Sequence, residues 1–325
     1  MKVLVVGGTG FAGHHVVNKL VGVGHEVTML ARNKTATIPP SVSMQIGDIQ
    51  EISDSQLADL VAGCSGIVHA AAAAVYSPLR ADTAAHYRAA NVEPVVRLIE
   101  AARNAGCDRA VLLGSYYATL HRDHPELRLV EGSPYIQSRV DQAAAAHRAA
   151  GAGISLAVLE LPYVLGATPG RPSSLDPFVQ RMLQGKSPLV YPGGTAVAAV
   201  EEVADATVAA LEKRVDGDLP VATANLRWAD LLRRLAAAAG CAPQRVWRLT
   251  AWELSLMFHA RAIQRRRQGV LPGFHTAKIS GLHASEAYVD LEVTCSALGI
   301  THADLDQAIR DTALANITSS VTEVR

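Results

Sequence analysis

Short runs of apolar residues alternate with segments of helical periodicity through the first half of the chain. The runs are continuously apolar or nearly so, as in strands that are covered on both faces of a sheet. They lie at residues 2–6, 26–30, 43–47, 66–70, 109–115 and 155–161. Helical patterns fall between them, near residues 11–23, 54–62, 82–105 and 134–150. This alternation predicts an α/β fold with a doubly wound parallel sheet.

The pattern loosens after about residue 166, where a loop rich in Gly, Pro and Ser begins. Residues 197–214 read as a short strand that leads into a helix, and 218–224 as a further strand. A candidate helix at 175–185 precedes these segments, and two more follow them at 226–239 and 251–268. Such connections usually build a cap over the carboxyl ends of the strands, where ligands bind in doubly wound folds.

The composition argues against several classes of partner. The chain has 325 residues with 30 basic and 30 acidic side chains, and 49% of its residues are hydrophobic. The zero net charge gives no reason to expect nucleic-acid or membrane binding, and no apolar run approaches the roughly 18–20 residues that span a bilayer. The apolar start is too short for a signal peptide. Four scattered cysteines without a CxxC pair indicate free thiols, so we expect a cytoplasmic protein.

A glycine loop directly after the first strand is the strongest motif. In "VLVVGGTGFAGHHVV", Gly7, Gly10 and Gly13 lie between an apolar strand and a helix. Gly7 permits a tight turn, Gly10 lets the backbone approach a pyrophosphate, and Gly13 allows close packing of helix and sheet. The positive end of the helix dipole favours the anion. The loop predicts a Rossmann domain over residues 1–165, joined by parts of 196–224, with 166–325 mainly a smaller, interleaved substrate-binding cap.

The end of the second strand indicates which dinucleotide is bound. An NAD site usually has an acidic residue there, about 20 residues past the glycines. This chain has Arg32 and, close by, Lys34, whereas Glu26 opens the strand at the other end. A guanidinium suits a 2′-phosphate. We therefore predict NADP (NADPH); the alternative is that both cations are ordinary solvated loop charges.

Further motifs resemble the extended short-chain dehydrogenase/reductase family over nearly the whole chain. Besides the glycine loop they are "GDI" (47–49), "HAAA" (69–72), "NVEPVVRLIEAARNAG" (91–106), "LLGSYY" (112–117), "SPYIQSR" (133–139), "LELPYVLG" (159–166) and "CSALGI" (295–300). Pro94 stands where the family usually has Gly, and Glu160 where Arg is frequent. The resemblance implies that Asp48 contacts the adenine and that Ala70, Ala71 and Ala72 lie along the cofactor. It also implies cofactor contacts from Thr9, Phe11, Ile49, Tyr135, Arg139 and Pro162.

The resemblance also implies a catalytic set of Ser115, Tyr135 and Arg139. Tyr135 would be the acid/base and Ser115 would hydrogen-bond the substrate oxygen, while Arg139 takes the place of the usual lysine. A free phenol has a pKa of about 10, and a cation about 4 Å away favours the phenolate by up to roughly 4 kcal/mol. Arginine supplies this field, but its guanidinium cannot release a proton as lysine can. The alternative is a structural helix with Tyr135 in packing and Arg139 on the surface.

Within the family, the spacing of 20 residues between Ser115 and Tyr135 and the "LPGF" segment resemble the dihydroflavonol-reductase-like and 3β-hydroxysteroid-dehydrogenase-like branches. The resemblance implies an NADP-dependent ketone or aldehyde reductase, or alcohol dehydrogenase, acting on a small apolar or polycyclic substrate. A nucleotide-sugar epimerase or dehydratase remains open, with basic residues available in the cap at Arg171, Arg181 and Lys186. A cofactor-bound protein with a sensing or non-redox role also remains open. Family resemblance implies a homodimer through the helices at 82–105 and 134–150. The "HRDH" stretch (121–124) lies in a predicted loop, and we expect no metal site there or elsewhere.

Overall fold

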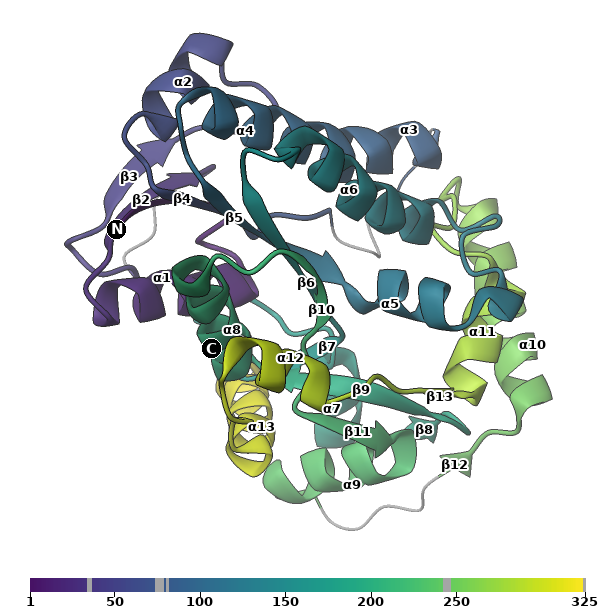
Figure 1. Ribbon diagram of the computed structural model, residues 1–325. Helices are drawn as coiled ribbons and strands as arrows, with labels where there is room; N and C mark the ends of the chain where they lie inside the picture. The colour runs from purple at the N-terminus through teal and green to yellow at the C-terminus, as the bar shows by residue number, and fades with distance from the viewer. Residues whose placement is uncertain (34–36, 74–78, 80–81, 242–246, 324–325) are drawn as a thin grey trace.

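The computed structural model describes residues 1–33, 37–73, 79, 82–241 and 247–323, with side chains to residue 317. Its main sheet has seven parallel strands in the order β10-β6-β5-β4-β1-β2-β3 (Figure 1). These strands are β1 (Lys2–Val6), β2 (Glu26–Ala31), β3 (Ser43–Ile46), β4 (Gly66–His69), β5 (Arg109–Ser115), β6 (Ser155–Leu161) and β10 (Gly217–Pro220). The predicted doubly wound parallel sheet is therefore confirmed.

Helices cover both faces of this sheet. One face carries α1 (Phe11–Gly22) and α8 (Val200–Lys213), and the other carries α2 (Asp54–Val61), α4 (Glu93–Asn104) and α6 (Pro134–Ala150) (Figure 1). Successive residues of β1 serve alternate cores, since Val3 and Val5 pack with α1 and α8 whereas Leu4 and Val6 pack on the other side. This two-residue alternation explains why the strands are apolar throughout.

The segment predicted as one long helix at 82–105 has three parts. Helix α3 (Thr83–Tyr87) leads into a π-helical turn (Arg88–Val92) and then into α4. Pro94 lies in the first turn of α4, where a missing amide N–H does little harm. The π-helical turn carries Asn91, which is fully buried. Such turns are frequent at functional sites.

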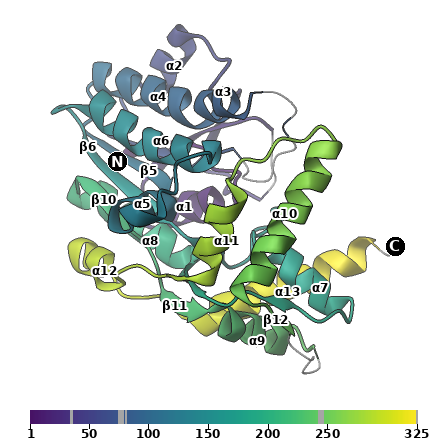
Figure 2. The ribbon, with the colours of Figure 1, turned by 90° about the vertical axis from the view of Figure 1, so that its right-hand side faces the viewer.

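The cap is built on a second sheet in the order β11-β9-β13, with β7 also paired to β9. Its strands are β7 (Tyr163–Leu165), β9 (Gly194–Ala199), β11 (Ala224–Arg227) and β13 (Glu286–Ala287), and β8 (Leu189–Val190) pairs separately with β12 (Trp247–Arg248). Its helices are α7 (Asp176–Leu183), α9 (Trp228–Ala238), α10 (Ala251–Arg267), α11 (Thr276–Ala284) and α13 (Leu305–Glu323), whereas α12 (Glu292–Leu298) packs on α8 and β10 of the sheet domain. Figure 2 shows α10 and α11 adjacent to each other in the cap.

The chain crosses between the two sheets more than once. The strand predicted at 218–224 is divided, because β10 ends at Pro220 in the main sheet and β11 begins at Ala224 in the cap sheet. Helix α8 returns to the main sheet and packs on α1. These contacts support the proposed return of parts of 196–224 to the first domain. Among the described residues, none of the helices combines the length and apolarity needed for a membrane span.

One local prediction is wrong. The "HRDH" stretch was expected in a loop, but His121, Arg122 and Asp123 form the last turn of helix α5 (Tyr116–Asp123). Helix α5 begins directly after β5, and Ser115 is its N-cap, with Oγ accepting a hydrogen bond from the Tyr117 N–H at 3.4 Å. The apolar strand pattern masked this helix start, since a serine at a strand end gives no distinct helical signal.

Candidate functional site

The glycine loop has the backbone geometry that its sequence predicts. Gly7 has a positive φ of 87°, and a Cβ there would lie 2.7 Å from the amide nitrogen of Ala71. The Gly10 N–H donates to the Gly7 carbonyl at 2.9 Å, which closes the turn. A Cβ at Gly13 would collide with the Gly7 carbonyl oxygen. The loop thus has no room for side chains and presents backbone N–H groups at the start of α1, which suits a pyrophosphate.

A segment from the start of the cap holds this loop in place. Arg171 donates from Nε to the Thr9 carbonyl at 2.7 Å, and Thr168 donates from Oγ1 to the Phe11 carbonyl at 2.9 Å. The Nε2 atom of His15 lies 3.1 Å from the Thr168 hydroxyl oxygen. Sequence reasoning missed these contacts because residues more than 150 positions apart make them.

The residues expected around the adenine lie at the ends of β2 and β3. Arg32 follows β2 directly and is exposed, whereas Lys34 lies outside the described residues. Asp48 is half-buried, and its Oδ1 accepts the Gln50 N–H at 3.0 Å. The neighbouring Ile49 is buried and packs among the core residues next to α2. Both positions therefore lie at the carboxyl edge of the sheet, where a dinucleotide binds in this type of fold.

The segment after β4 runs along the glycine loop. Ala70 donates from its N–H to the Val6 carbonyl at 2.8 Å, and Ala71 lies against Gly7, while Ala72 is exposed. The Ala73 N–H donates to Oδ1 of Asn91 at 2.9 Å. The backbone of this segment is thereby fixed at both ends.

Tyr135 is half-buried at the start of α6 and lies among aromatic rings. Its ring centroid is 5.3 Å from that of Tyr87, 5.4 Å from that of Phe274 and 6.2 Å from that of Tyr117. Its backbone N–H donates to the Gly273 carbonyl at 3.0 Å, which ties α6 to the cap. Within the described part of the chain its hydroxyl makes no hydrogen bond. The phenol is thus available to a substrate.

Arg139 lies one helical turn further along α6 and is buried, with only 4% of its surface exposed. Its Nη2 donates to the Leu113 carbonyl at 2.9 Å, whereas Nε and Nη1 are buried without a partner among the described residues. Burial lowers the pKa of this guanidinium, and the nearby Tyr135 acts in the opposite direction. A surface position for Arg139 is therefore ruled out. Its two unpaired donors would suit the hydroxyl groups of a cofactor ribose.

His69 at the end of β4 is the first residue of the "HAAA" motif and a neighbour of this site. Both of its ring nitrogens are buried without a partner among the described residues. Burial, reinforced by the charge of Arg139, lowers the pKa of His69 to about 4. The ring is therefore neutral near pH 7. The motif indicated the position of His69, whereas the burial of its ring beside Arg139 could not be inferred from the sequence.

A chain of hydrogen bonds links Asn91 to the backbone of Tyr135. Asn91 Nδ2 donates to the Ser138 hydroxyl at 2.9 Å, and Ser138 donates to the Tyr135 carbonyl at 2.7 Å. Gln142 Nε2 donates to the Asn91 carbonyl at 2.7 Å. The buried side of Tyr135 is therefore held by a nearly complete polar network, and Asn91 also holds Ala73.

Glu160 and Pro162, at the end of β6, have different roles. Glu160 is fully buried and accepts two hydrogen bonds from Arg122, at 2.6 and 2.7 Å, as well as one from Thr119. Burial raises the pKa of Glu160, and Arg122 opposes this shift. Glu160 thus secures α5 to the sheet, while Pro162 lies at the turn between β6 and β7.

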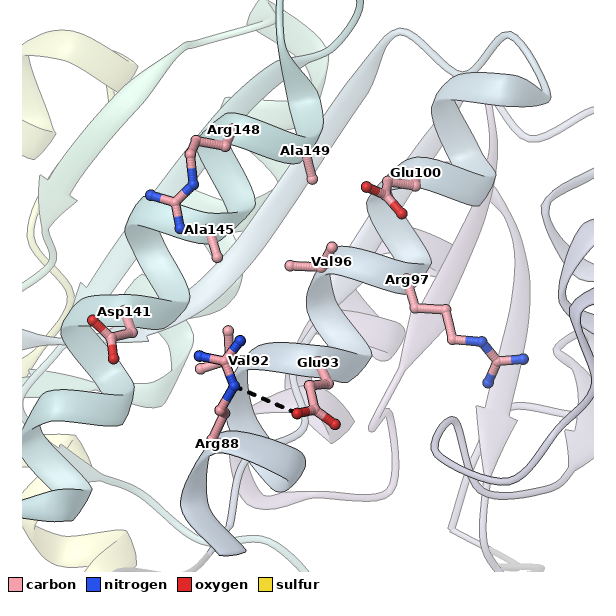
Figure 3. A pocket seen from close by; sticks show the side chains of 10 residues that line it. All are labelled: Arg88, Val92, Glu93, Val96, Arg97, Glu100, Asp141, Ala145, Arg148 and Ala149. Atoms are coloured by element: carbon pink, nitrogen blue, oxygen red, sulfur yellow. Dashed lines mark ion pairs between the residues drawn. The ribbon is translucent and has the colours of Figure 1, made fainter. Parts of the chain in front are cut away.

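Helices α4 and α6 enclose a groove of about 540 Å³ (Figure 3). Small and branched apolar side chains lie along it, and charged residues of both signs border them. The apolar group is Val92, Val96, Ala145 and Ala149; the charged group is Arg88, Glu93, Arg97, Glu100, Asp141 and Arg148. This surface is the one expected to pair in a dimer.

The residues at the carboxyl edge of the main sheet fit a nicotinamide dinucleotide. The glycine loop gives a cradle without side chains, and Arg139 retains buried donors that nothing in the described chain satisfies. The residues predicted to be catalytic, Ser115, Tyr135 and Arg139, come from β5 and α6, which adjoin this edge. Tyr117 adjoins two of them: its N–H donates to Ser115 Oγ at 3.4 Å, and its ring centroid lies 6.2 Å from that of Tyr135.

Solved structures share this fold along its whole length. The crystal structure of gox2253 matches with a TM-score of 0.78 at 20% identity, covering 98% of each chain. A UDP-N-acetylglucosamine 4-epimerase from Methanobrevibacter ruminantium M1, in complex with UDP-N-acetylmuramic acid, matches with a TM-score of 0.71 at 18% identity, again over 98% of each chain. At these identities the likeness concerns the fold alone.

Relatives in sequence include named reductases. A 3-diazoavenalumate denitrifying reductase from Streptomyces sp is 31% identical over 68% of this chain and 75% of its own length. A putative dihydroflavonol 4-reductase from Synechocystis is 33% identical over 35% of this chain and 32% of its own. The uncharacterized protein y4nL of Sinorhizobium fredii is 25% identical over 62% of this chain, which spans only 56% of y4nL.

The match to a family model covers most of the sheet domain, including α8 and β10, where the chain comes back to the main sheet. Residues 3–222 match the model of the NAD dependent epimerase/dehydratase family. The match begins in β1 and ends just after β10, so it includes the glycine loop, Tyr135 and the whole seven-stranded sheet. It confirms the resemblance to extended short-chain dehydrogenases/reductases, and the chain belongs to the NAD dependent epimerase/dehydratase family.

Proposed function

We propose that the protein is an NADP-dependent oxidoreductase that interconverts a ketone or aldehyde and the corresponding alcohol. One observation carries this proposal: a phenol with a free hydroxyl, Tyr135, lies one helical turn from the buried cation Arg139. Two relatives are named as reductases. The proposed domain division, with the cofactor on residues 1–165 and the substrate mainly on the cap, follows from the same placement.

The bound nicotinamide would supply or accept the hydride. Tyr135 would donate a proton to the carbonyl oxygen during reduction and remove it during oxidation. The charge on Arg139 would stabilise the phenolate, and its unpaired Nε and Nη1 would hold the cofactor ribose. The hydroxyl proton of Ser115 is available to the substrate oxygen, because Oγ uses a lone pair to cap α5.

The choice of NADP depends on Arg32, which stands exposed where an NAD site would have a carboxylate. Titration with both reduced cofactors should show tighter binding of NADPH than of NADH. Arg32→Ala should reduce that preference at least tenfold by weakening NADPH alone. The exposed Arg148→Ala on α6 is a control that should leave both affinities unchanged. Tighter binding of NADH by the wild type would refute the assignment.

Aromatic residues support an apolar, planar substrate. They make up only 5% of the chain, yet many of them form one connected set of ring contacts that includes Tyr135 and extends into the cap. Its members are Tyr87, Tyr116, Tyr117, Tyr135, Tyr163, Phe178, Tyr191, Trp228, Phe258 and Phe274. Several of these rings, such as Tyr87, Tyr116 and Trp228, are core residues. The half-buried rings of Tyr135 and Phe274 are the ones a substrate could meet, and ring faces favour flat apolar molecules over sugars with many hydroxyl groups.

The nucleotide-sugar alternative draws support from the solved structures that share the fold, several of which contain UDP-sugars. The basic residues expected to hold a diphosphate have other partners, however. Arg171 binds the Thr9 carbonyl, Arg181 donates to the Ser187 carbonyl at 2.9 Å, and Lys186 donates to Gln184 at 2.9 Å. Thermal shift with UDP-glucose and UDP separates the cases, because an epimerase of this kind should be stabilised by UDP.

The experiment that tests the main proposal is a substrate panel followed with NADPH. The panel should contain aromatic and polycyclic ketones and aldehydes and, because one relative is named for a diazo compound, an aromatic diazo compound as well. Tyr135→Phe and Ser115→Ala should each reduce any ketone turnover at least about 100-fold. If the protein binds NADPH and neither substitution changes its turnover, the sensing or non-redox alternative fits instead.

We also propose a cytoplasmic homodimer in which the groove between α4 and α6 meets its symmetry mate. Two copies of this surface could pair, because apolar side chains lie at its centre and charged side chains of both signs lie along its border (Figure 3). Val96→Asp at the centre should convert a dimer into a monomer in light scattering after gel filtration. A wild-type monomer would refute this part of the proposal without affecting the catalytic part.

A further inference from the structure

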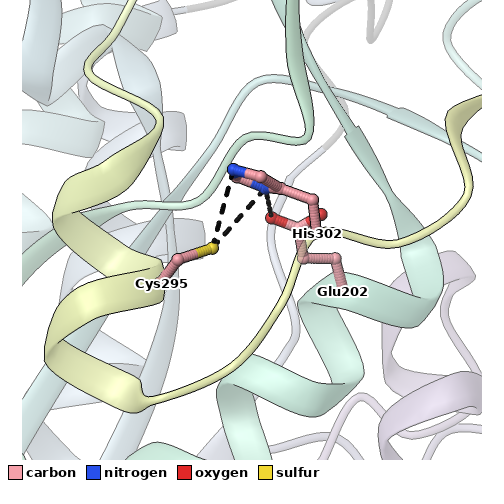
Figure 4. Close-up of side chains that lie close together, drawn as sticks. All are labelled: Glu202, Cys295 and His302. Carbon is pink, nitrogen blue, oxygen red and sulfur yellow. Dashed lines mark hydrogen bonds and ion pairs between the residues drawn. The ribbon is translucent and has the colours of Figure 1, made fainter.

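Three side chains of metal-binding type meet outside the proposed catalytic site. Glu202 comes from α8, Cys295 from α12, and His302 from the segment between α12 and α13 (Figure 4). Their ligand atoms all lie within 4.8 Å of one another. His302 Nδ1 is 3.0 Å from Glu202 Oε1 and 3.5 Å from Cys295 Sγ. The reaction proposed above uses none of these residues.

Burial and hydrogen bonding hold the carboxylate in a defined orientation. The Glu202 side chain is 1% exposed, and its Oε2 accepts hydrogen bonds from the Thr223 hydroxyl at 2.6 Å and from the Ala303 N–H at 3.1 Å. Oε1 is therefore the atom that faces His302. Protein hydrogen bonds to the second oxygen of a carboxylate are the usual means of orienting a metal ligand.

The separations between the atoms are those of a small tetrahedral site. Zinc bonds of about 2.0–2.3 Å to N, O and S give ligand-to-ligand distances of roughly 3.3–3.7 Å. The observed 3.0 and 3.5 Å need only small adjustments to reach this range. A set of thiolate, imidazole and carboxylate suits Zn²⁺, whereas Ca²⁺ and Mg²⁺ prefer oxygen ligands alone.

Glu292 on the same helix as the cysteine lies beside the other ring nitrogen of His302. It stands three residues before Cys295 on α12, so the two share a helical face. Its Oε1 is 3.8 Å from His302 Nε2, whereas Nδ1 faces Glu202 and Cys295, so Glu292 is placed to orient the imidazole and water would be the fourth ligand. Glu292, Cys295 and His302 thus lie within one short segment, and Glu202 joins them from the sheet domain.

We propose that Glu202, Cys295 and His302, completed by water, form a structural Zn²⁺ site that fastens the C-terminal segment to α8. The ion replaces the thiol proton of Cys295 and the hydrogen bond between His302 and Glu202. A thiol binds zinc as the thiolate, so metal binding releases the Cys295 proton to solvent. The expectation of no metal site is thereby revised; sequence reasoning missed it because Glu202 lies far from the other ligands.

Cobalt and zinc ions added to the full-length, metal-stripped protein test the site. One Co²⁺ per chain should produce a near-ultraviolet thiolate-to-cobalt charge-transfer band with the intense visible bands of tetrahedral cobalt, and Zn²⁺ should remove both. Zn²⁺ should raise Tm by about 5 °C at 100-fold excess over Kd and release about one proton per ion. Cys295→Ser should abolish the charge-transfer band, whereas Cys241→Ser, in the half-buried cysteine of the cap, should retain it.

Two results would overturn the proposal. One is wild-type protein that gives no thiolate-to-cobalt band, and the other is a band that persists in Cys295→Ser. If Cys295→Ser does not fold, wild-type protein still decides the matter, because chelation must lower Tm and reloading with Zn²⁺ must restore it. These readouts do not involve NADPH or turnover, so they stand apart from the proposed oxidoreductase function.

Discussion

The charge on Arg139 provides the sharpest test of the proposed mechanism. Arg139→Met keeps the length of the side chain and removes the charge. Residues four apart on a helix have Cβ atoms about 5–6 Å apart, and two unit charges at that separation interact by roughly 3 kcal/mol at an effective dielectric of 20. Because Arg139 is 4% exposed, water and salt screen this interaction little. The lost stabilisation of a Tyr135 phenolate corresponds to a rate factor of roughly 100.

The assay follows kcat for oxidation of the alcohol product with NADP, from pH 6 to pH 10. Arg139→Met should lower kcat about 100-fold at neutral pH. Arg139→Lys keeps the charge and should stay within tenfold of the wild type. Arg233→Met, at an exposed arginine on α9 outside both the proposed site and the proposed dimer groove, is the matched control and should leave kcat unchanged.

Loss of packing is the competing explanation, because Arg139 also donates to the Leu113 carbonyl. A double-mutant cycle separates the two. In a Tyr135→Phe background, Arg139→Met should cost little further activity, since the phenolate it stabilises is absent. The reasoning is refuted if Arg139→Met stays within threefold of the wild type at pH 7, or if its effect is equally large with Phe at position 135.

Three further substitutions test the supports of the site. Gly13→Ala should weaken NADPH binding at least tenfold in fluorescence titration, because its Cβ would collide with the loop that it must pack against. Arg122→Ala leaves the carboxylate of Glu160 buried without its cation. Because the Arg122 side chain is 42% exposed, water can enter the space it leaves, so urea denaturation should show a decrease of about 2 kcal/mol in the free energy of unfolding. His147 has its pKa raised chiefly by the hydrogen bond to Asp218, so its contribution to stability is full below about pH 6.5 and declines as pH rises through the raised pKa. His147→Ala should therefore destabilise the protein more at pH 5.5 than at pH 9 in urea denaturation, and an equal loss at both values would contradict this.

The sheet and the glycine loop were predictable because each depends on local sequence. A parallel strand between two helical layers must be apolar on both faces, so residues 2–6 and 155–161 stand out without any knowledge of their partners. Likewise Gly7 is required by its own positive φ, and that requirement is visible in the spacing of the glycines. The family match over residues 3–222 confirms the resemblance drawn from these motifs.

The remaining features depend on contacts between distant segments. Helix α5 was missed because its first residues, Tyr116 and Tyr117, continue the apolar pattern of the strand before them. The short cap strand β13 consists of two residues whose partner lies in β9, far back in the chain. Glu160 was noted only as a departure from the family pattern; that it binds Arg122 on α5 could not be inferred from either position alone.

The surroundings of Tyr135 also limit how its proton can return. On its buried side, Arg139 cannot release a proton, Ser138 already donates its hydroxyl proton to the Tyr135 carbonyl, and the Asn91 carbonyl accepts from Gln142. None of these groups therefore has a proton to pass to the phenol. Tyr135 is only half-buried, and its hydroxyl has no hydrogen-bond partner among the described residues. In the proposed mechanism the proton would therefore reach Tyr135 from its exposed side, so a bound substrate would control when the phenol is reprotonated.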